Sequence, residues 1–171
     1  TYTASEIQPD MLNADITQTT DSPSWGGLYL QYFEKFDQVQ QQKGILSVTK
    51  KLFIEKIGSD GKQELLPLGK EKLKTGDKVI TRLTLSLKQD MDFLYLKDFR
   101  AACFEPIGQL SGNQWKFGTV YYEESKDAVT NFFFNSLAKG TYVLEYPVWV
   151  NQAGTYQDGI ATSVSYTHLT L

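Results

Sequence analysis

Residues that carry covalent and metal chemistry are scarce in this chain. Of its 171 residues, one is a cysteine, Cys103, and one is a histidine, His168. A single cysteine excludes an internal disulfide framework, and a zinc site, which needs three or four ligands, has little to draw on. A nucleophile activated by histidine needs that histidine nearby, and His168 lies near the C-terminus. We therefore predict no catalytic residue, no metal and no cofactor.

Arginines and long apolar runs are also few. The only arginines are Arg82 and Arg100, and 17 basic residues against 20 acidic ones give a net charge of -3. This balance argues against a nucleic-acid partner. No run of about 18 apolar residues occurs, so we expect no transmembrane segment. What the chain does have is 41% hydrophobic and 13% aromatic residues, which suffice for a dense core.

The hydrophobic pattern has a period of two. In Lys78–Lys88 one side of the segment is almost wholly apolar and the other is mostly polar, and Tyr142–Val150 repeats this pattern. Residues 46–54 also repeat it, although Lys50 falls on their apolar side. Such segments, separated by glycine-containing turns and without a clear helix, predict an all-β fold, an antiparallel β-sandwich.

Two details of this pattern restrict the arrangement of the strands. Pro147 has no N–H group for a sheet, so we place its strand at an edge or at a bulge. Phe132-Phe133-Phe134 cannot place all three rings on one face. This run indicates a strand covered on both sides, or a ring lying under a loop.

The chain divides into three predicted segments. We interpret residues 1–42 as the terminal strands of a preceding β domain plus a linker, with Leu28–Val39 favoured as strand over helix. Residues 43–162 are predicted to form a complete sandwich. The peptide 163–171 resembles a translated sequencing adaptor, so we interpret it as a non-native tail; a genuine final strand is the alternative.

The remaining candidates for chemistry have simpler structural explanations. Asp90 and Asp92 fall at a strand end, and the adjacent Glu123 and Glu124 would face opposite sides of a strand. Acid–base catalysis instead needs two carboxyl groups in different environments across a cleft. The segment Cys103–Pro106 has a proline where an internal thioester would need a glutamine, so no thioester can form there.

The three tryptophans are the candidate contact residues. We interpret Trp25, Trp115 and Trp149 as candidate interdomain contacts, and Trp149 falls on the side of its strand opposite to the apolar one. Aromatic rings at such positions also bind sugars and peptides. A secreted carbohydrate- or peptide-binding sandwich is therefore the alternative function.

An ordered series of motifs resembles the bacterial alpha-2-macroglobulin family. The segment Leu73–Leu85 is similar to the family's Leu-Lys-x-Gly-Asp-x-Val-x-x-Arg-Leu strand entry. Asn131–Asn135 and Leu137–Tyr142 look like its later strands, and Trp25–Tyr29 looks like the segment just upstream. The similarity covers roughly residues 24–162, most of the chain.

The resemblance implies an immunoglobulin-like or macroglobulin-like sandwich at the C-terminal end of a protease-trapping protein. Such proteins are arrays of β domains, usually exported to the periplasm or cell envelope and often anchored as lipoproteins. Cleavage of a bait region makes them collapse around the attacking protease. On this reading the chain is a non-catalytic structural module. Its partners are the other domains of the same full-length chain and, indirectly, target proteases.

Overall fold

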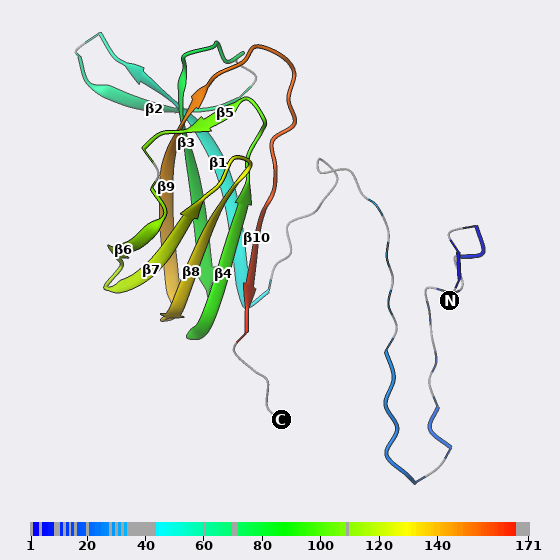
Figure 1. The fold of residues 1–171 in the computed structure, drawn as a ribbon. Coiled ribbons are helices and arrows are strands. Elements are labelled where there is room, and N and C mark those ends of the chain that lie inside the picture. Colours follow the sequence, from blue (N-terminus) through cyan, green and yellow to red (C-terminus); the bar gives the residue numbers. More distant parts are fainter. Residues whose placement is uncertain are drawn as a thin grey trace. The chain divides into compact units, whose positions relative to one another are not determined.

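Figure 1 shows the fold of the chain as a computed structural model. The structure describes residues 2–3, 5–8, 11, 13, 15, 17–19, 21–27, 29, 31, 33, 44–59, 61–69, 72–108 and 110–166. Two compact units, Thr1–Phe33 and Glu34–Leu171, are distinguished. The described residues of the first unit include no strand. The strand predicted at Leu28–Val39 falls mostly outside the described residues and stays a prediction.

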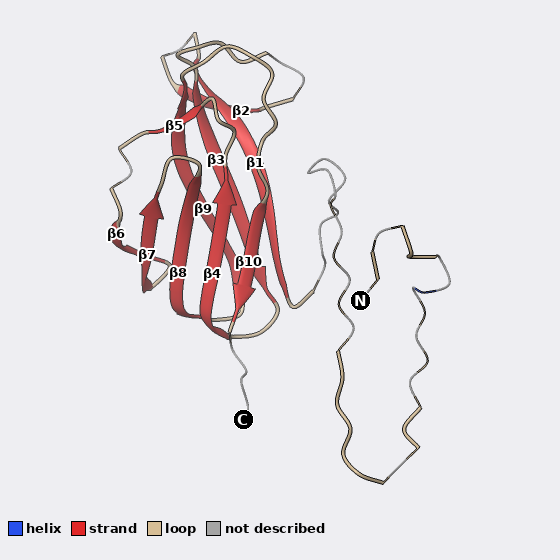
Figure 2. Cartoon of the chain, turned by 45° about the vertical axis from the view of Figure 1, so that its right-hand side comes forward, coloured by secondary structure: helices blue, strands red, loops and turns tan. Residues whose placement is uncertain are grey.

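The second unit is a sandwich of two sheets (Figure 2). One five-stranded sheet has the order β2-β1-β3-β9-β5, and the other has the order β10-β4-β8-β7-β6. All neighbouring strands are antiparallel. The strands are β1 (Leu46–Ile57), β2 (Gln63–Pro67), β3 (Lys78–Leu87), β4 (Met91–Phe99), β5 (Phe104–Pro106), β6 (Gly112–Lys116), β7 (Thr119–Ser125), β8 (Val129–Leu137), β9 (Gly140–Val150) and β10 (Ala161–Ser165). The predicted all-β antiparallel sandwich is confirmed.

The core lies between the sheets and contains the residues that the alternation directs inward. Leu83 of β3 and Leu96 of β4 have no exposed surface, and Phe132 and Phe134 of β8 are only 2% exposed. Because successive side chains of a strand point to opposite faces, Phe133 lies outward and is 41% exposed. The expectation that this strand is covered on both sides, or that a ring lies under a loop, is therefore wrong.

Pro147 lies on β9, next to the point where the pairing of β9 with β5 ends. In strand order β9 is an interior strand, which corrects the prediction of a simple edge strand. Its pairing with β5 runs only from Val148 to Val150, however. The Ile107 N–H donates to the Pro147 carbonyl (3.2 Å), so the proline nitrogen also faces this outer side. The missing N–H is tolerated there because the β5 ladder has already ended.

The hairpin of β6 and β7 ties the two sheets together beside β9. Phe117 and Gly118 both have positive φ angles, 60° and 74°, as a tight two-residue hairpin turn requires. The Phe117 ring packs edge-on against Tyr142, with centroids 5.2 Å apart. Lys116 Nζ donates to the Val143 carbonyl (3.2 Å). The turn between β6 and β7 in one sheet thus packs against β9 in the other sheet.

The opposite side of the sandwich is closed where the chain before β10 passes close to the end of β4. The Phe99 N–H donates to the Ile160 carbonyl (3.1 Å). A Cβ atom at Gly159 would lie 2.4 Å from Phe99 Cβ and 2.6 Å from the Phe99 carbonyl oxygen. Real Cβ atoms do not approach backbone this closely, so this position requires glycine.

We expect Gly159→Ala to lower the free energy of unfolding by about 1–3 kcal/mol, the usual cost of overpacking. Urea unfolding followed by tryptophan fluorescence measures the change. Gly112→Ala is the matched control, because a Cβ atom there meets nothing within 4 Å. Equal stability of the two variants would contradict the close approach of the two segments.

Candidate functional site

A buried polar cluster joins the two sheets. Lys50 of β1 places its Nζ 3.0 Å from Asp98 Oδ1 of β4, an ion pair without the angle of a hydrogen bond. The hydroxyl of Tyr146, on β9, donates to Asp98 Oδ2. Lys50 Nζ also donates to Asp158 Oδ1 (3.1 Å) and to the Phe99 carbonyl (2.6 Å). One ammonium group therefore holds both sheets and the chain before β10.

The environment of this cluster shifts its proton equilibria. Burial raises the pKa of Asp98, while the Lys50 charge and the hydrogen bond from Tyr146 act to lower it, and Asp158 adds a small upward effect. Burial, and the neighbouring Asp98 charge, raise the pKa of Tyr146 far above its ordinary value. The phenol therefore stays protonated and donates. Asp98 has no exposed surface, so the cluster serves packing and does not contact a substrate.

The other candidates for chemistry are not brought together. Burial raises the pKa of the Cys103 thiol, which makes it a poor nucleophile. Asp90 accepts the Lys139 N–H (2.7 Å) at a turn. Burial raises the pKa of Glu123, whereas hydrogen bonds from Asn131 and Lys126 lower that of Glu124. These two glutamates lie on opposite sides of β7 and do not form a pair across a cleft.

The described residues also hold no metal cluster and no membrane-spanning helix. No group of three or more histidine, cysteine or acidic side chains among them could hold a metal ion. None of their segments forms a helix long and apolar enough to cross a membrane.

A row of partly exposed side chains crosses the outer face of the β10-β4-β8-β7-β6 sheet, and we call it the aromatic row. Tyr122, Phe133, Tyr95 and Val164 are successive register partners on β7, β8, β4 and β10. The rings of Tyr95 and Phe133 are stacked, with centroids 4.9 Å apart and planes at 11°. Tyr122, Phe133 and Val164 are between 41% and 46% exposed.

Hydrogen bonds that link Tyr95 to Asn131 and Asn131 to Glu124 hold the aromatic row in place. The Tyr95 hydroxyl donates to Asn131 Oδ1 (2.9 Å), and Asn131 Nδ2 donates to Glu124 Oε2 (2.7 Å). Lys126 pairs with the other oxygen of Glu124 at 3.1 Å. The aromatic row is thus preorganised, although it contributes little to the core. The signal that could have revealed it in the sequence is an aromatic residue at the outward position of three strands.

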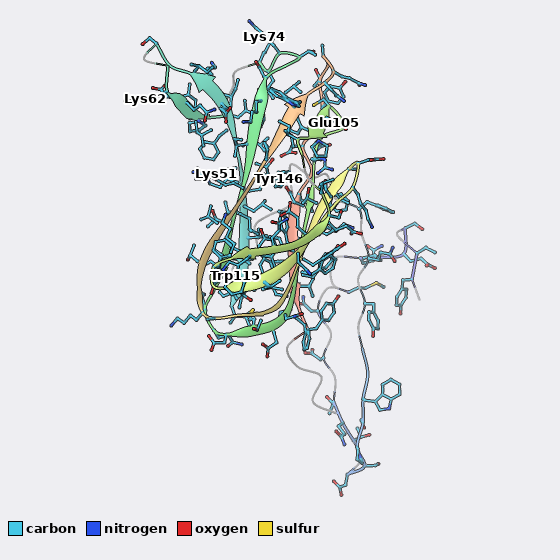
Figure 3. The ribbon with its side chains drawn as sticks, turned by 60° about the vertical axis from the view of Figure 1, so that its left-hand side comes forward. Lys51, Lys62, Lys74, Glu105, Trp115 and Tyr146 are labelled. Carbon is cyan, nitrogen blue, oxygen red and sulfur yellow. The ribbon has the colours of Figure 1, made fainter. Side chains whose placement is uncertain are left out.

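The three predicted contact tryptophans lie apart. Trp115 pairs with the exposed Val120, on the outer side of its sheet, and is 72% exposed. Trp149 is 43% exposed on the outer side of the other sheet, between Lys78 and Glu105. Figure 3 shows Glu105 near one end of the sandwich and Trp115 well away from it. Trp25, which is 99% exposed, belongs to the other unit.

Comparison with known proteins places this sandwich in a family. Residues 46–167 match the family model described as "Bacterial Alpha-2-macroglobulin MG10 domain". The chain belongs to this family. No curated protein matches the chain.

The match confirms the resemblance over residues 46–162, whereas the resemblance of residues 24–45 stays a prediction. Bacterial alpha-2-macroglobulins are protease inhibitors and not enzymes, are built as multidomain chains and are generally exported. The MG10 match begins with β1 and continues past β10. It therefore covers both sheets of the sandwich.

The domain boundaries stay predictions. Ser163, Val164 and Ser165 fall in the segment that we interpret as a non-native tail, and they pair with Leu96, Tyr95 and Leu94 of β4. Residues 167–171, which include His168, lie outside the described residues.

The Lys50–Asp98 ion pair predicts strongly coupled substitutions. Lys50→Met leaves the Asp98 carboxylate buried without a counter-charge, and we expect a loss of about 3–5 kcal/mol in the free energy of unfolding. The double variant Lys50→Met/Asp98→Leu removes both charges. It should lose less than the sum of the two single losses by about 1 kcal/mol or more, as guanidinium unfolding can measure. Additive losses would show that the two side chains act separately.

The raised pKa of Asp98 predicts a pH dependence of definite sign. The folded domain holds this proton more tightly than the unfolded chain, whose value is near 3.8. As the pH rises from that value through the folded pKa, the unfolded state gains relative stability. The unfolding free energy of the native MG10 domain should therefore fall relative to that of Asp98→Asn across this window. A flat or rising difference would contradict the assigned cause.

Proposed function

We propose that the chain is a non-catalytic structural module of a protease-trapping bacterial alpha-2-macroglobulin, and that the aromatic row contacts another domain of the parent protein. The aromatic row carries this proposal. It is exposed, apolar and held in place by hydrogen bonds, although the core does not need it. Extended apolar patches on a domain surface mark interaction sites.

The family supports a neighbouring domain as the occupant of this surface. Because alpha-2-macroglobulins are multidomain chains, covalent linkage gives a neighbouring domain a high effective concentration. A modest apolar contact is then sufficient to hold the two domains together. The parent protein would act in the periplasm or at the cell envelope, with a lipoprotein anchor, and would meet its target proteases through other domains.

The tryptophans extend the proposal to further contacts. Trp115 and Trp149 lie on the outer sides of different sheets, so they would serve separate contacts within the parent chain. Trp25 would contribute from the other unit. Large exposed rings at such sites contribute much of the energy of protein contacts.

The alternative is a carbohydrate- or peptide-binding sandwich, and the arrangement of the rings does not favour its carbohydrate-binding form. A sugar-binding surface presents several ring faces side by side, whereas Tyr95 and Phe133 cover each other's faces. The opposite outer sides occupied by Trp115 and Trp149 prevent these two rings from forming one surface. We therefore keep the structural module as the proposed function.

The test uses the full-length parent protein with Phe133→Ser, compared with the exposed and unrelated Leu110→Ser. Inhibition of an endopeptidase acting on a large protein substrate is measured for both. We expect Phe133→Ser to lower the inhibitory capacity or the melting temperature of the parent. In the 171-residue chain alone the same change should cost less than about 1 kcal/mol, because Phe133 is 41% exposed.

Two results would contradict the proposal. One is a parent protein that is as stable and as inhibitory with Phe133→Ser as with Leu110→Ser. The other is a parent protein without any inhibitory activity, which would remove the protease-trapping role itself.

A further inference from the structure

A basic groove crosses the outer face of the β2-β1-β3-β9-β5 sheet, the sheet that does not carry the aromatic row. Its lining comes from three neighbouring strands and from the end of β6. The residues of the basic groove are Thr49, Lys51, Phe53, Arg82, Thr84, Lys116, Val143 and Glu145. Apart from Lys116, these positions are the outward ones of β1, β3 and β9, and among them only Phe53, at 9% exposed, is buried.

The strand register arranges the groove in rows. Lys51, Arg82 and Glu145 are register partners across β1, β3 and β9. Thr49, Thr84 and Val143 form the next row. Lys116 reaches over the edge of β9, where its Nζ donates to the Val143 carbonyl (3.2 Å). One lysine therefore lies at the β1 side of the groove and another at the β9 side (Figure 3 labels Lys51).

The groove has two cationic groups that no carboxylate of the described residues neutralises by an ion pair. Arg82 is paired with Glu145 and lies over the Phe53 ring, 4.3 Å from its centroid. Lys51 makes no ion pair within the described part of the chain, and Lys116 donates only to the Val143 carbonyl. Lys116 also interacts electrostatically with Glu123, which is partly buried and whose pKa is raised by this burial. The groove is thus locally positive on a chain of net charge -3.

We propose that the basic groove binds a short acidic peptide segment in an extended conformation. Its carboxylates pair with Lys51 and Lys116, and an apolar side chain between them packs on Val143, which is 37% exposed. The groove spans two strand separations, about 10 Å, which an extended peptide covers in three to four residues. Because Lys116 reaches over the edge of β9, two acidic residues with three residues between them, about 13 Å apart, suit the two lysines.

Charge and composition favour a peptide over a long polyanion. Two ammonium groups, of which that of Lys116 already donates to the Val143 carbonyl, supply few contacts for a nucleic acid or polyphosphate, whose binding depends on the number of phosphates neutralised. The net charge of -3 repels such a chain beyond the groove. A short acidic peptide meets only the local positive field. The apolar groups between the lysines give it a contact that a polyanion cannot use.

The probe is the peptide acetyl-Glu-Ala-Val-Ala-Glu-amide, titrated into the isotopically labelled 171-residue chain and followed by NMR. We expect saturable shifts confined to β1, β3, β9 and the end of β6, with a Kd near about 1 mM that weakens as salt is added. Lys51→Glu should weaken binding at least about threefold, since one exposed ion pair is replaced by repulsion. Lys88→Glu is the matched control, because Lys88 is exposed and lies outside the groove.

Several results would overturn the inference. They are equal binding of the peptide with glutamine in place of glutamate, equal losses for Lys51→Glu and Lys88→Glu, or no shifts in the groove. Binding of polyphosphate without binding of the acidic peptide would assign the groove to a different ligand. The inference does not rest on the interdomain role of the aromatic row, and its failure leaves that proposal standing.

Discussion

One ammonium group, placed between the two sheets, links three segments of the sandwich. Lys50 occupies an inward position of β1, where it pairs with Asp98 of β4 and bonds to the chain before β10. Such a pair is costly to desolvate, and the hydroxyl of Tyr146 donates to the other oxygen of the Asp98 carboxylate. It forces the edge of one sheet and the last strand of the other into a single arrangement. Gly159 permits this approach because its missing side chain leaves room for Phe99.

Closure of both sides leaves the two outer sheet faces for contact, and these faces differ in chemistry. One bears stacked aromatic rings held by a chain of hydrogen bonds. The other bears a groove between Lys51 and Lys116. An apolar contact suits a permanently linked neighbouring domain, because the buried side chains do not need to return to solvent. Paired charges suit reversible binding, because water and salt compete with them. A domain without catalytic groups can therefore still serve two kinds of partner.

Much of the architecture could be predicted from the sequence, and the reasons are local. Apolar and polar residues alternate along β3 and β9, and successive side chains of a strand face opposite sides. The sandwich could therefore be predicted from this alternation. Pro147 was harder, because its tolerance depends on where β5 stops pairing. Phe133 was predicted to be covered, but which face of β8 another layer covers is a question of tertiary packing. The aromatic row escaped prediction because its members come from four strands whose register the sequence does not state.

The amino-acid sequence by itself determined that the chain forms an antiparallel sandwich, has one cysteine and one histidine, and resembles the macroglobulin family. These properties follow from residue types and from spacing along the chain. Only the tertiary structure decided that Lys50 pairs with Asp98, that Trp115 and Trp149 lie on different faces, and that Lys51 and Lys116 border one groove. The reason is that these relations join residues far apart in sequence, and strand order and register alone bring such residues together.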